Sequence, residues 1–193
     1  MMRIQHVLLG QQPVMPWANG GGSTRQIAID PPEGSLGAGF RWRVSIAQVG
    51  CDSPFSRLPG IDRSLWLLRG AGVRLDVEGS EVVLARQFQR FDFAGETPIT
   101  ARLLEGPVED LNVMVKRRSV RAESNVVELE AGAAIDVAPA AQSLVVVLAG
   151  SLRTRAGQVV GVGDALRVDG DGALHAVCAG ASTLLTCRFH AAP

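Results

Sequence analysis

Trp42–Ala47, with the sequence WRVSIA, is the stretch that decides the fold. Its three even-numbered residues are apolar, and they alternate with Arg43, Ser45 and Ala47. Successive side chains of a β-strand point to opposite faces of the sheet. The alternation therefore predicts a strand with one face in the core.

Similar short runs, apolar or alternating, continue from residue 40 onward and are separated by Gly, Pro, Asp and Ser. This spacing is typical of antiparallel β proteins, and no segment has the pattern of a long amphipathic helix. The clearest predicted strands are Trp42–Val49, Ser64–Leu68, Val73–Val77, Leu111–Val115, Leu144–Leu148 and Thr183–Phe189. We therefore predict an all-β fold with few helices.

The chain also repeats itself. Residues 67–70, LLRG, precede an alternating run and resemble residues 147–150, VLAG. A spacing of roughly 75 to 80 residues exceeds that of a solenoid and suits two jelly-roll halves. The stretch 144–189 also has the glycine-turn pattern of a cupin. We expect two jelly-roll halves, each a double-stranded β-helix: residues 1–118 carry the candidate ligand pocket, and residues 119–193 form a degenerate, cupin-like half.

Composition narrows the class of protein. The 193 residues carry 19 basic and 19 acidic side chains, so charge gives no reason to expect nucleic acid or an anionic membrane as partner. Three cysteines without a close-spaced pair fit a reducing cytoplasm. The N-terminus lacks the features of a secretory signal, and the apolar run Leu144–Ala149 is too short to span a bilayer. We expect a cytoplasmic protein whose exposed strand edges would permit a homodimer.

Metal and hydrolase chemistry find no support in the sequence. Many cupins hold a metal with two closely spaced histidines, a glutamate and a later histidine. Here the only histidines are His6, His175 and His190, which never recur at ligand spacing. No Gly-x-Ser-x-Gly elbow is present either. We predict no metal centre and no cofactor.

Residues 16–25, with the sequence PWANGGGSTR, form the first candidate binding segment. The segment lacks the Gly-Lys-Ser/Thr ending of a phosphate-binding loop and runs into a strand-like stretch instead of a helix. A glycine hairpin and a ligand loop both explain it. The neighbouring Trp17, Asn19, Thr24 and Arg25 favour recognition, because they add an aromatic wall and directional hydrogen-bonding groups.

Arg63 is the sharpest single candidate. It follows a Pro-Gly-Ile-Asp turn and precedes an apolar strand, so it is expected at the mouth of a cavity. There a guanidinium would bind a carboxylate through two charge-assisted hydrogen bonds. The alternative is an internal ion pair with Asp62, Asp110 or Glu105. Asp110 and Asn112 lie on one face of a predicted strand, which concentrates polar side chains in the first half of the chain.

These motifs resemble the HutD/Ves family, in the same order, over about the first 117 residues. They are residues 16–25, 42–47, 55–63 and 106–114. The resemblance implies a two-cupin protein, often encoded with bacterial histidine-utilisation enzymes, with an accessory or regulatory role. It makes Arg63 the pocket arginine of the family's Pro-Gly-x-Asp-Arg motif. The chain departs from the family at Ala18, where lysine is usual, and at Leu58, where phenylalanine is frequent.

We expect a metal-independent protein that binds a small carboxylate, such as N-formylglutamate or a related acid of the histidine pathway. The predicted binding residues are Arg63, Asn19, Trp17, Thr24, Arg25, Asp62, Asp110 and Asn112. One alternative is an enzyme, an isomerase or amidohydrolase, that uses Asp62 or Asp110 as general base. Another is a protein-interaction module whose glycine loops bind a second chain.

Overall fold

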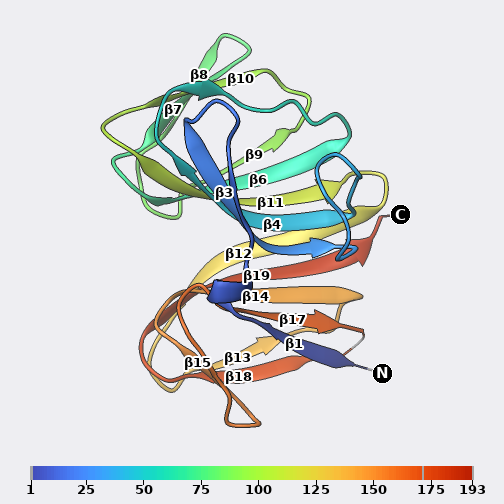
Figure 1. Ribbon diagram of the computed structural model, residues 1–193. Coiled ribbons are helices and arrows are strands. Elements are labelled where there is room, and N and C mark those ends of the chain that lie inside the picture. Colours follow the sequence, from blue (N-terminus) through green and yellow to red (C-terminus); the bar gives the residue numbers. More distant parts are fainter. Residues whose placement is uncertain (1, 171, 193) are drawn as a thin grey trace. The chain divides into compact units, whose positions relative to one another are not determined.

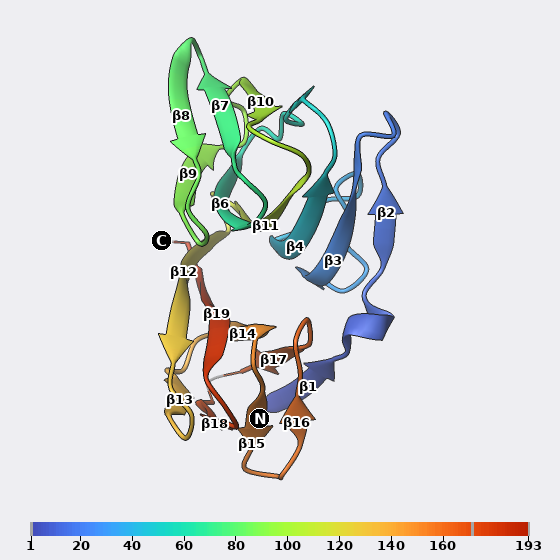
Figure 2. The same cartoon turned by 90° about the vertical axis from the view of Figure 1, so that its left-hand side faces the viewer.

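The computed structural model describes residues 2–170 and 172–192, and antiparallel β-strands dominate it (Figures 1 and 2). Within these ranges the one helical element is the short 3-10 helix η1, Leu9–Gln11. No helix of the described residues is long and apolar enough to cross a membrane. The prediction of an all-β chain is confirmed.

The chain forms two compact units. Pro13–Ser119 make up one, called the pocket unit below, and Met1–Gln12 together with Val120–Pro193 make up the second unit. The division expected from the sequence, at residue 118, placed residues 1–12 in the first half. The structure corrects this, because β1 (Arg3–Val7) pairs along its whole length with β17 (Ala165–Asp169).

The pocket unit consists of two sheets that enclose an apolar core. The six-stranded sheet has the order β2 (Val14–Pro16), β3 (Gly22–Asp30), β4 (Trp42–Val49), β11 (Val108–Lys116), β6 (Ile61–Arg69), β9 (Arg90–Ala94). The four-stranded sheet has the order β5 (Ser53–Pro54), β10 (Ile99–Leu103), β7 (Val73–Val77), β8 (Ser80–Leu84). Leu65, Leu75 and Leu84 are among the fully buried side chains of this core.

The second unit is built in the same way. Its five-stranded sheet has the order β1, β17, β14 (Gln142–Ala149), β19 (Ser182–Ala191), β12 (Val120–Leu129). Its four-stranded sheet has the order β13 (Ala134–Val137), β18 (Leu174–Cys178), β15 (Leu152–Thr154), β16 (Val159–Val160). Val145, Leu166 and Leu184 are fully buried in its core.

The internal repeat in the sequence corresponds to a repeated strand order in the two units. The neighbours β9-β6-β11-β4 of one unit match β17-β14-β19-β12 of the other, and the four-stranded sheets match throughout. Gly70 directly follows β6 and Gly150 directly follows β14, with backbone φ angles of 99° and 76°. A side chain on Gly70 would come within 2.6 Å of the Pro107 carbonyl oxygen, so the turn requires glycine.

The deciding stretch is strand β4, as predicted. Trp42 and Val44 are completely buried on one face. Arg43 and Ser45, on the other face, are also buried, with exposures of 3% and 2%. From Trp42 to Ala47 both faces of β4 are therefore buried, although the alternation required this of only one.

Candidate functional site

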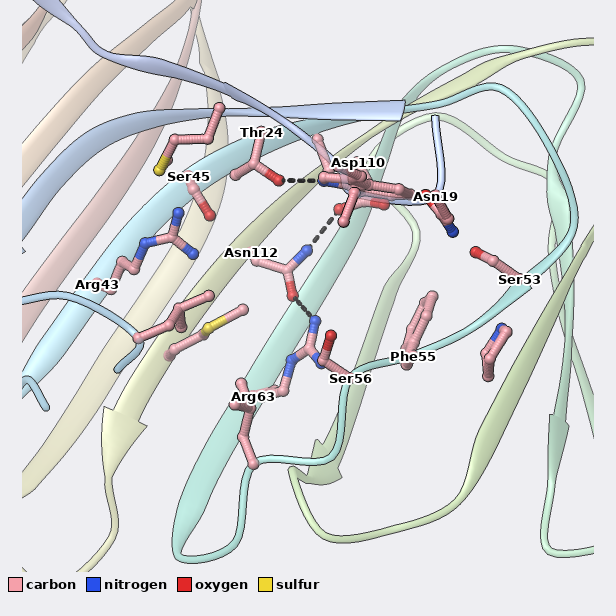
Figure 3. Close-up of a pocket in the computed structure, with 18 of the residues that line it drawn as sticks. Asn19, Thr24, Arg43, Ser45, Ser53, Phe55, Ser56, Arg63, Asp110 and Asn112 are labelled. Carbon is pink, nitrogen blue, oxygen red and sulfur yellow. Dashed lines mark hydrogen bonds between the residues drawn. The ribbon is translucent and has the colours of Figure 1, made fainter. Parts of the chain in front are cut away.

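A cavity of about 500 Å³ lies in the pocket unit, on the face of the six-stranded sheet that carries Arg43 and Ser45 (Figure 3). Strands β3, β4, β11 and β6 contribute side chains to it, and the segments around residues 15–19 and 53–58 wall it. It is lined by Met15, Pro16, Trp17, Ala18, Asn19, Thr24, Leu36, Arg43, Ser45, Ala47, Ser53, Pro54, Phe55, Ser56, Leu58, Arg63, Asp110, Asn112 and Met114.

Strand register sets the floor of the cavity. On β11, Asp110, Asn112 and Met114 share one face, because side chains two residues apart point the same way. Met114 pairs with Arg43 on β4 and with Arg63 on β6. The two arginines therefore flank the central strand at the same level and enter the cavity from opposite sides.

A chain of hydrogen bonds connects three of these residues (Figure 3). Arg63 Nη2 donates to Asn112 Oδ1 at 2.7 Å, and Asn112 Nδ2 donates to Asp110 Oδ1 at 2.5 Å. A guanidinium can only donate, and an ionised carboxylate can only accept. The Asn112 amide is therefore held in one orientation, with its oxygen toward the arginine.

Arg63 is a buried cation with an unused donor. Its Nε is buried and has no hydrogen-bond partner among the described residues. The guanidinium lies 5.3 Å from the ring centre of Phe55 and 4.8 Å from that of Phe93, which is a cation–π geometry. Burial lowers the pKa of Arg63 to about 10, with Asp110 raising it and Arg43 lowering it further. The side chain is still charged at neutral pH.

Asp110 is the carboxyl group of the site. Burial raises its pKa to about 7, although the Arg63 charge and the hydrogen bond from Asn112 act in the opposite direction. Desolvation dominates, because a buried carboxylate loses its hydration and only part of that loss is replaced. Near neutral pH, Asp110 is therefore divided between its charged and uncharged forms.

Arg43 supplies a second cation. Its Nε donates to Gln26 Oε1 at 2.9 Å, which holds the side chain while the guanidinium points into the cavity (Figure 3). Burial lowers the pKa of Arg43. With Arg63 and Asp110, it gives the cavity two positive groups and one partly ionised carboxyl group, an excess of positive charge.

The first candidate binding segment, residues 16–25, forms a hairpin and also a wall of the cavity. It connects β2 to β3, which pair from Val14–Arg25 to Pro16–Ser23. Trp17 Nε1 donates to Thr24 Oγ1 at 2.8 Å, so the hydroxyl fixes the indole against the cavity. Asn19 Oδ1 accepts from the Gly21 backbone N–H at 3.0 Å and shapes the turn.

The structure brings six of the eight predicted site residues together, namely Trp17, Asn19, Thr24, Arg63, Asp110 and Asn112. Arg25 and Asp62, the other two, do not line the cavity. Arg25 pairs with Ile46 on the opposite face of the sheet from Thr24. Asp62 lies beside Arg63 on β6, points the other way, and accepts from Arg117 Nε at 2.6 Å.

Sequence reasoning missed part of the lining. Arg43 and Ser45 stand in the quoted strand, where two polar side chains on one face already signalled a polar floor. Ser53 and Ser56 carry no such signal. Ala18 and Leu58, the two departures from the HutD/Ves pattern, both line the cavity and so change its wall directly. Among the described residues, no three histidine, cysteine or carboxylate side chains gather as metal ligands.

Comparisons with known proteins identify the family of the chain. The HutD family model matches residues 10–186. An uncharacterised 21.2 kDa protein in the hutC 3' region of Pseudomonas putida is 34% identical over 175 residues, which cover 89% of this chain and 90% of the relative. Protein Ves of Escherichia fergusonii is 35% identical over 119 residues, 61% of each chain.

Solved structures extend the comparison to the fold. HutD from Pseudomonas fluorescens SBW25, in a formate condition, superposes with a TM-score of 0.83 at 30% identity and covers 99% of this chain and 100% of its own. A cupin 2 conserved barrel domain protein from Leptotrichia buccalis superposes with a TM-score of 0.56 at 12% identity, over 86% of this chain and 87% of its own. The second likeness shows the cupin fold alone.

Proposed function

The chain belongs to the HutD family, and from this premise we propose that it binds a small carboxylate in the cavity of the pocket unit, as an accessory or regulatory protein of histidine utilisation. The observation that carries the proposal is Arg63. Its guanidinium is buried and charged, yet its Nε finds no hydrogen-bond partner in the part of the chain that the structure describes. Burying an unused charged donor is costly, and an incoming anion would relieve that cost.

The shape and lining of the cavity favour a small organic acid. Its volume lies in the range of small-molecule sites. Two arginines match the planar, two-oxygen geometry of a carboxylate. Trp17, Phe55 and Leu58 offer an apolar wall, and the Asn19 and Ser53 side chains offer polar groups for the remainder of the ligand.

Two relatives support a link to the histidine pathway. One is encoded in the hutC 3' region, and another, HutD, was solved in a formate condition. Formate and N-formylglutamate both carry the planar O–C–O group of a carboxylate, whose two oxygens accept from an arginine fork. N-formylglutamate is therefore the first acid to test.

The proposal is tested by calorimetric titration with formate, N-formylglutamate, urocanate, glutamate and pyroglutamate. We expect selective, saturable binding that Arg63→Met weakens about 10- to 100-fold, because hydrogen bonds to a charged group contribute about 1.5–3 kcal/mol. Arg102→Met is the matched control, since Arg102 is exposed on β10 of the same unit. Equal losses in both variants, or no binding of any acid by the unmodified protein, would contradict the proposal.

A second candidate function is an enzyme that acts on a small acid with Asp110 as general base. The observation that favours it is a carboxyl group with a pKa of about 7 in the same cavity as two arginines. Asp62, the other base considered, does not line the cavity, so we propose Asp110 for this role. NMR spectra of each acid during long incubation with the protein test this function: product formation that Asp110→Asn abolishes would establish it.

A further inference from the structure

We propose that carboxylate binding in the cavity is coupled to uptake of one proton by Asp110, so that the cavity holds its ligand more tightly below neutral pH than above it. The inference rests on the proposed function and adds a regulatory property to it. It follows from the way in which Asp110, Asn112 and Arg63 are joined across β11 and β6.

Arg63 is the charged side chain that acts on Asp110. Asp110 is 4% exposed, and its neighbours across the sheet are Ala47 on β4 and Leu67 on β6, neither of which titrates. Among the described residues that line the cavity, the ionisable side chains are Arg43, Arg63 and Asp110. The Arg63 charge favours ionisation of Asp110, and Arg43 acts on Arg63 from the far side of β11.

A bound carboxylate shifts the ionisation equilibrium of Asp110 toward the protonated form. The negative charge of the anion disfavours ionisation of Asp110 and so opposes the effect of the Arg63 charge. The anion also displaces water from the cavity, which further disfavours the charged carboxyl. Both effects raise the pKa of Asp110 above the value of about 7 that it has in the free protein.

The proton comes from solvent and ends on a carboxylate oxygen of Asp110, and no bond of the ligand forms or breaks. Protonated Asp110 keeps an oxygen that accepts from Asn112 Nδ2, so the amide orientation that serves Arg63 is preserved. The binding geometry is therefore the same in both protonation states, and only the electrostatic energy differs.

The sign of the pH dependence follows from linkage. Below a pH of about 7, Asp110 is already protonated in the free protein, so the affinity is at its maximum and flat. Above this value, binding requires proton uptake, and the affinity falls by up to about tenfold per pH unit until the pKa of the bound state is reached. The ligand's own carboxylate, with a pKa near 4, stays ionised throughout this range.

The test is a calorimetric titration with N-formylglutamate and with formate at about pH 6.5 and about pH 8.5. Titrations near pH 7.5 in Tris and in triethanolamine, which differ in ionisation heat, measure proton uptake directly. We expect about tenfold weaker binding at the higher pH and uptake of more than half a proton near pH 7.5. Asp110→Asn, which mimics the protonated side chain, should bind equally at both pH values without proton uptake.

Asp62→Asn is the matched control, because Asp62 neighbours Arg63 in sequence but lies outside the cavity. It should keep the pH dependence of the unmodified protein. Unchanged affinity with no proton uptake in the unmodified protein would overturn the coupling and leave carboxylate binding intact. Absence of binding at every pH would overturn the proposed function and the coupling together.

A measurement on the unmodified protein keeps the inference testable if the Asp110→Asn variant fails to fold. Carbon-13 NMR of aspartate carboxyl groups in the free, unmodified protein should show one aspartate that titrates near pH 7. Its resonance should disappear in Asp110→Asn and should shift to a higher pKa when N-formylglutamate is added. Titration of Asp110 near its ordinary value of about 4 would overturn the inference.

Discussion

Arg63 illustrates how a buried charge is held before any ligand is present. The Phe55 and Phe93 rings face its guanidinium, Asn112 accepts from Nη2, and Asp110 adds a negative charge beyond the amide. Each contact offsets part of the cost of desolvating the cation, yet none of them occupies Nε. This unoccupied donor is the reason why we propose Arg63 as the group that binds the carboxylate.

Asp110 makes the free energy of unfolding depend on pH. Its folded-state pKa, about 7, lies above the unfolded value near 4, so the folded state binds the extra proton between these two values. Its contribution to stability is therefore fully present below about pH 4 and is lost as the pH rises to about 7. Asp110→Asn should remove this loss, which is on the order of a few kcal/mol at pH 8.

Urea denaturation of the unmodified protein and of Asp110→Asn at a series of pH values measures the effect. The difference in free energy of unfolding should grow between about pH 4 and about pH 7 and then remain constant. Asp62→Asn provides the comparison, because Asp62 pairs with Arg117 at the surface. A difference that is the same at all pH values would show that Asp110 does not titrate as the structure indicates.

At the scale of elements, the β2–β3 hairpin presents Trp17 to the cavity and depends on one close contact. A Cβ on Gly22 would come within 2.2 Å of the Gln48 carbonyl oxygen and 2.9 Å of the Trp17 ring. Gly22→Ala should therefore displace β3 from β4 and cost about 1–3 kcal/mol of stability. Gly20→Ala, with open space around it but φ of +70°, should cost only about 1 kcal/mol.

Thermal unfolding and intrinsic tryptophan fluorescence check this prediction. Gly22→Ala should lower the melting temperature more than Gly20→Ala and should also change the Trp17 environment and weaken carboxylate binding. Equal effects of the two substitutions would mean that backbone conformation, not the approach of β3 to β4, governs the hairpin.

The strands also show how much of the fold and of the candidate site could be predicted from the sequence. The sequence predicted β4 with its correct bounds, Trp42–Val49. The two-residue spacing of Asp110 and Asn112 correctly placed both on one face of β11. The same alternation explains why Arg25 and Asp62 do not line the cavity. In β3 and β6 the side chains of adjacent residues point to opposite faces of the sheet, so Arg25 points away from the face of Thr24, and Asp62 points away from the face of Arg63. Deciding which member of each pair faces inward requires the partner strands, which lie far away in the sequence.

At the scale of the whole molecule, one topology occurs twice and only one copy carries the polar cavity. An offset of 80 residues superposes the β6 and β14 turns at Gly70 and Gly150. Asp110 pairs with Leu67, whereas at the matching place Leu184 pairs with Val147. The second unit thus has a leucine in the position of the carboxyl group, packed in its apolar core. The sequence indicated this difference between the two halves, because the segments around Asp110 and Leu184 can be compared in it directly.

The position of β1 could not be read from the sequence, because its partner β17 lies some 160 residues away. His6 Nε2 and Asp164 Oδ2, 2.9 Å apart, add a side-chain contact to this pairing. Removing residues 2–7 would leave β17 as an unprotected edge of the five-stranded sheet. We expect the melting temperature to fall by several degrees, since a loss of about 2 kcal/mol shifts it by roughly 4–8 °C in a chain of this size.

Hydrogen exchange separates this effect from general unfolding. Protection should be lost at Ala165–Asp169, where β1 pairs, while formate and N-formylglutamate still bind, because every residue that lines the cavity lies within Pro13–Ser119. Loss of binding with protection intact at β17 would instead assign residues 2–7 to the pocket unit. The two outcomes distinguish a division by sequence position from a division by strand pairing, and the structure requires the second.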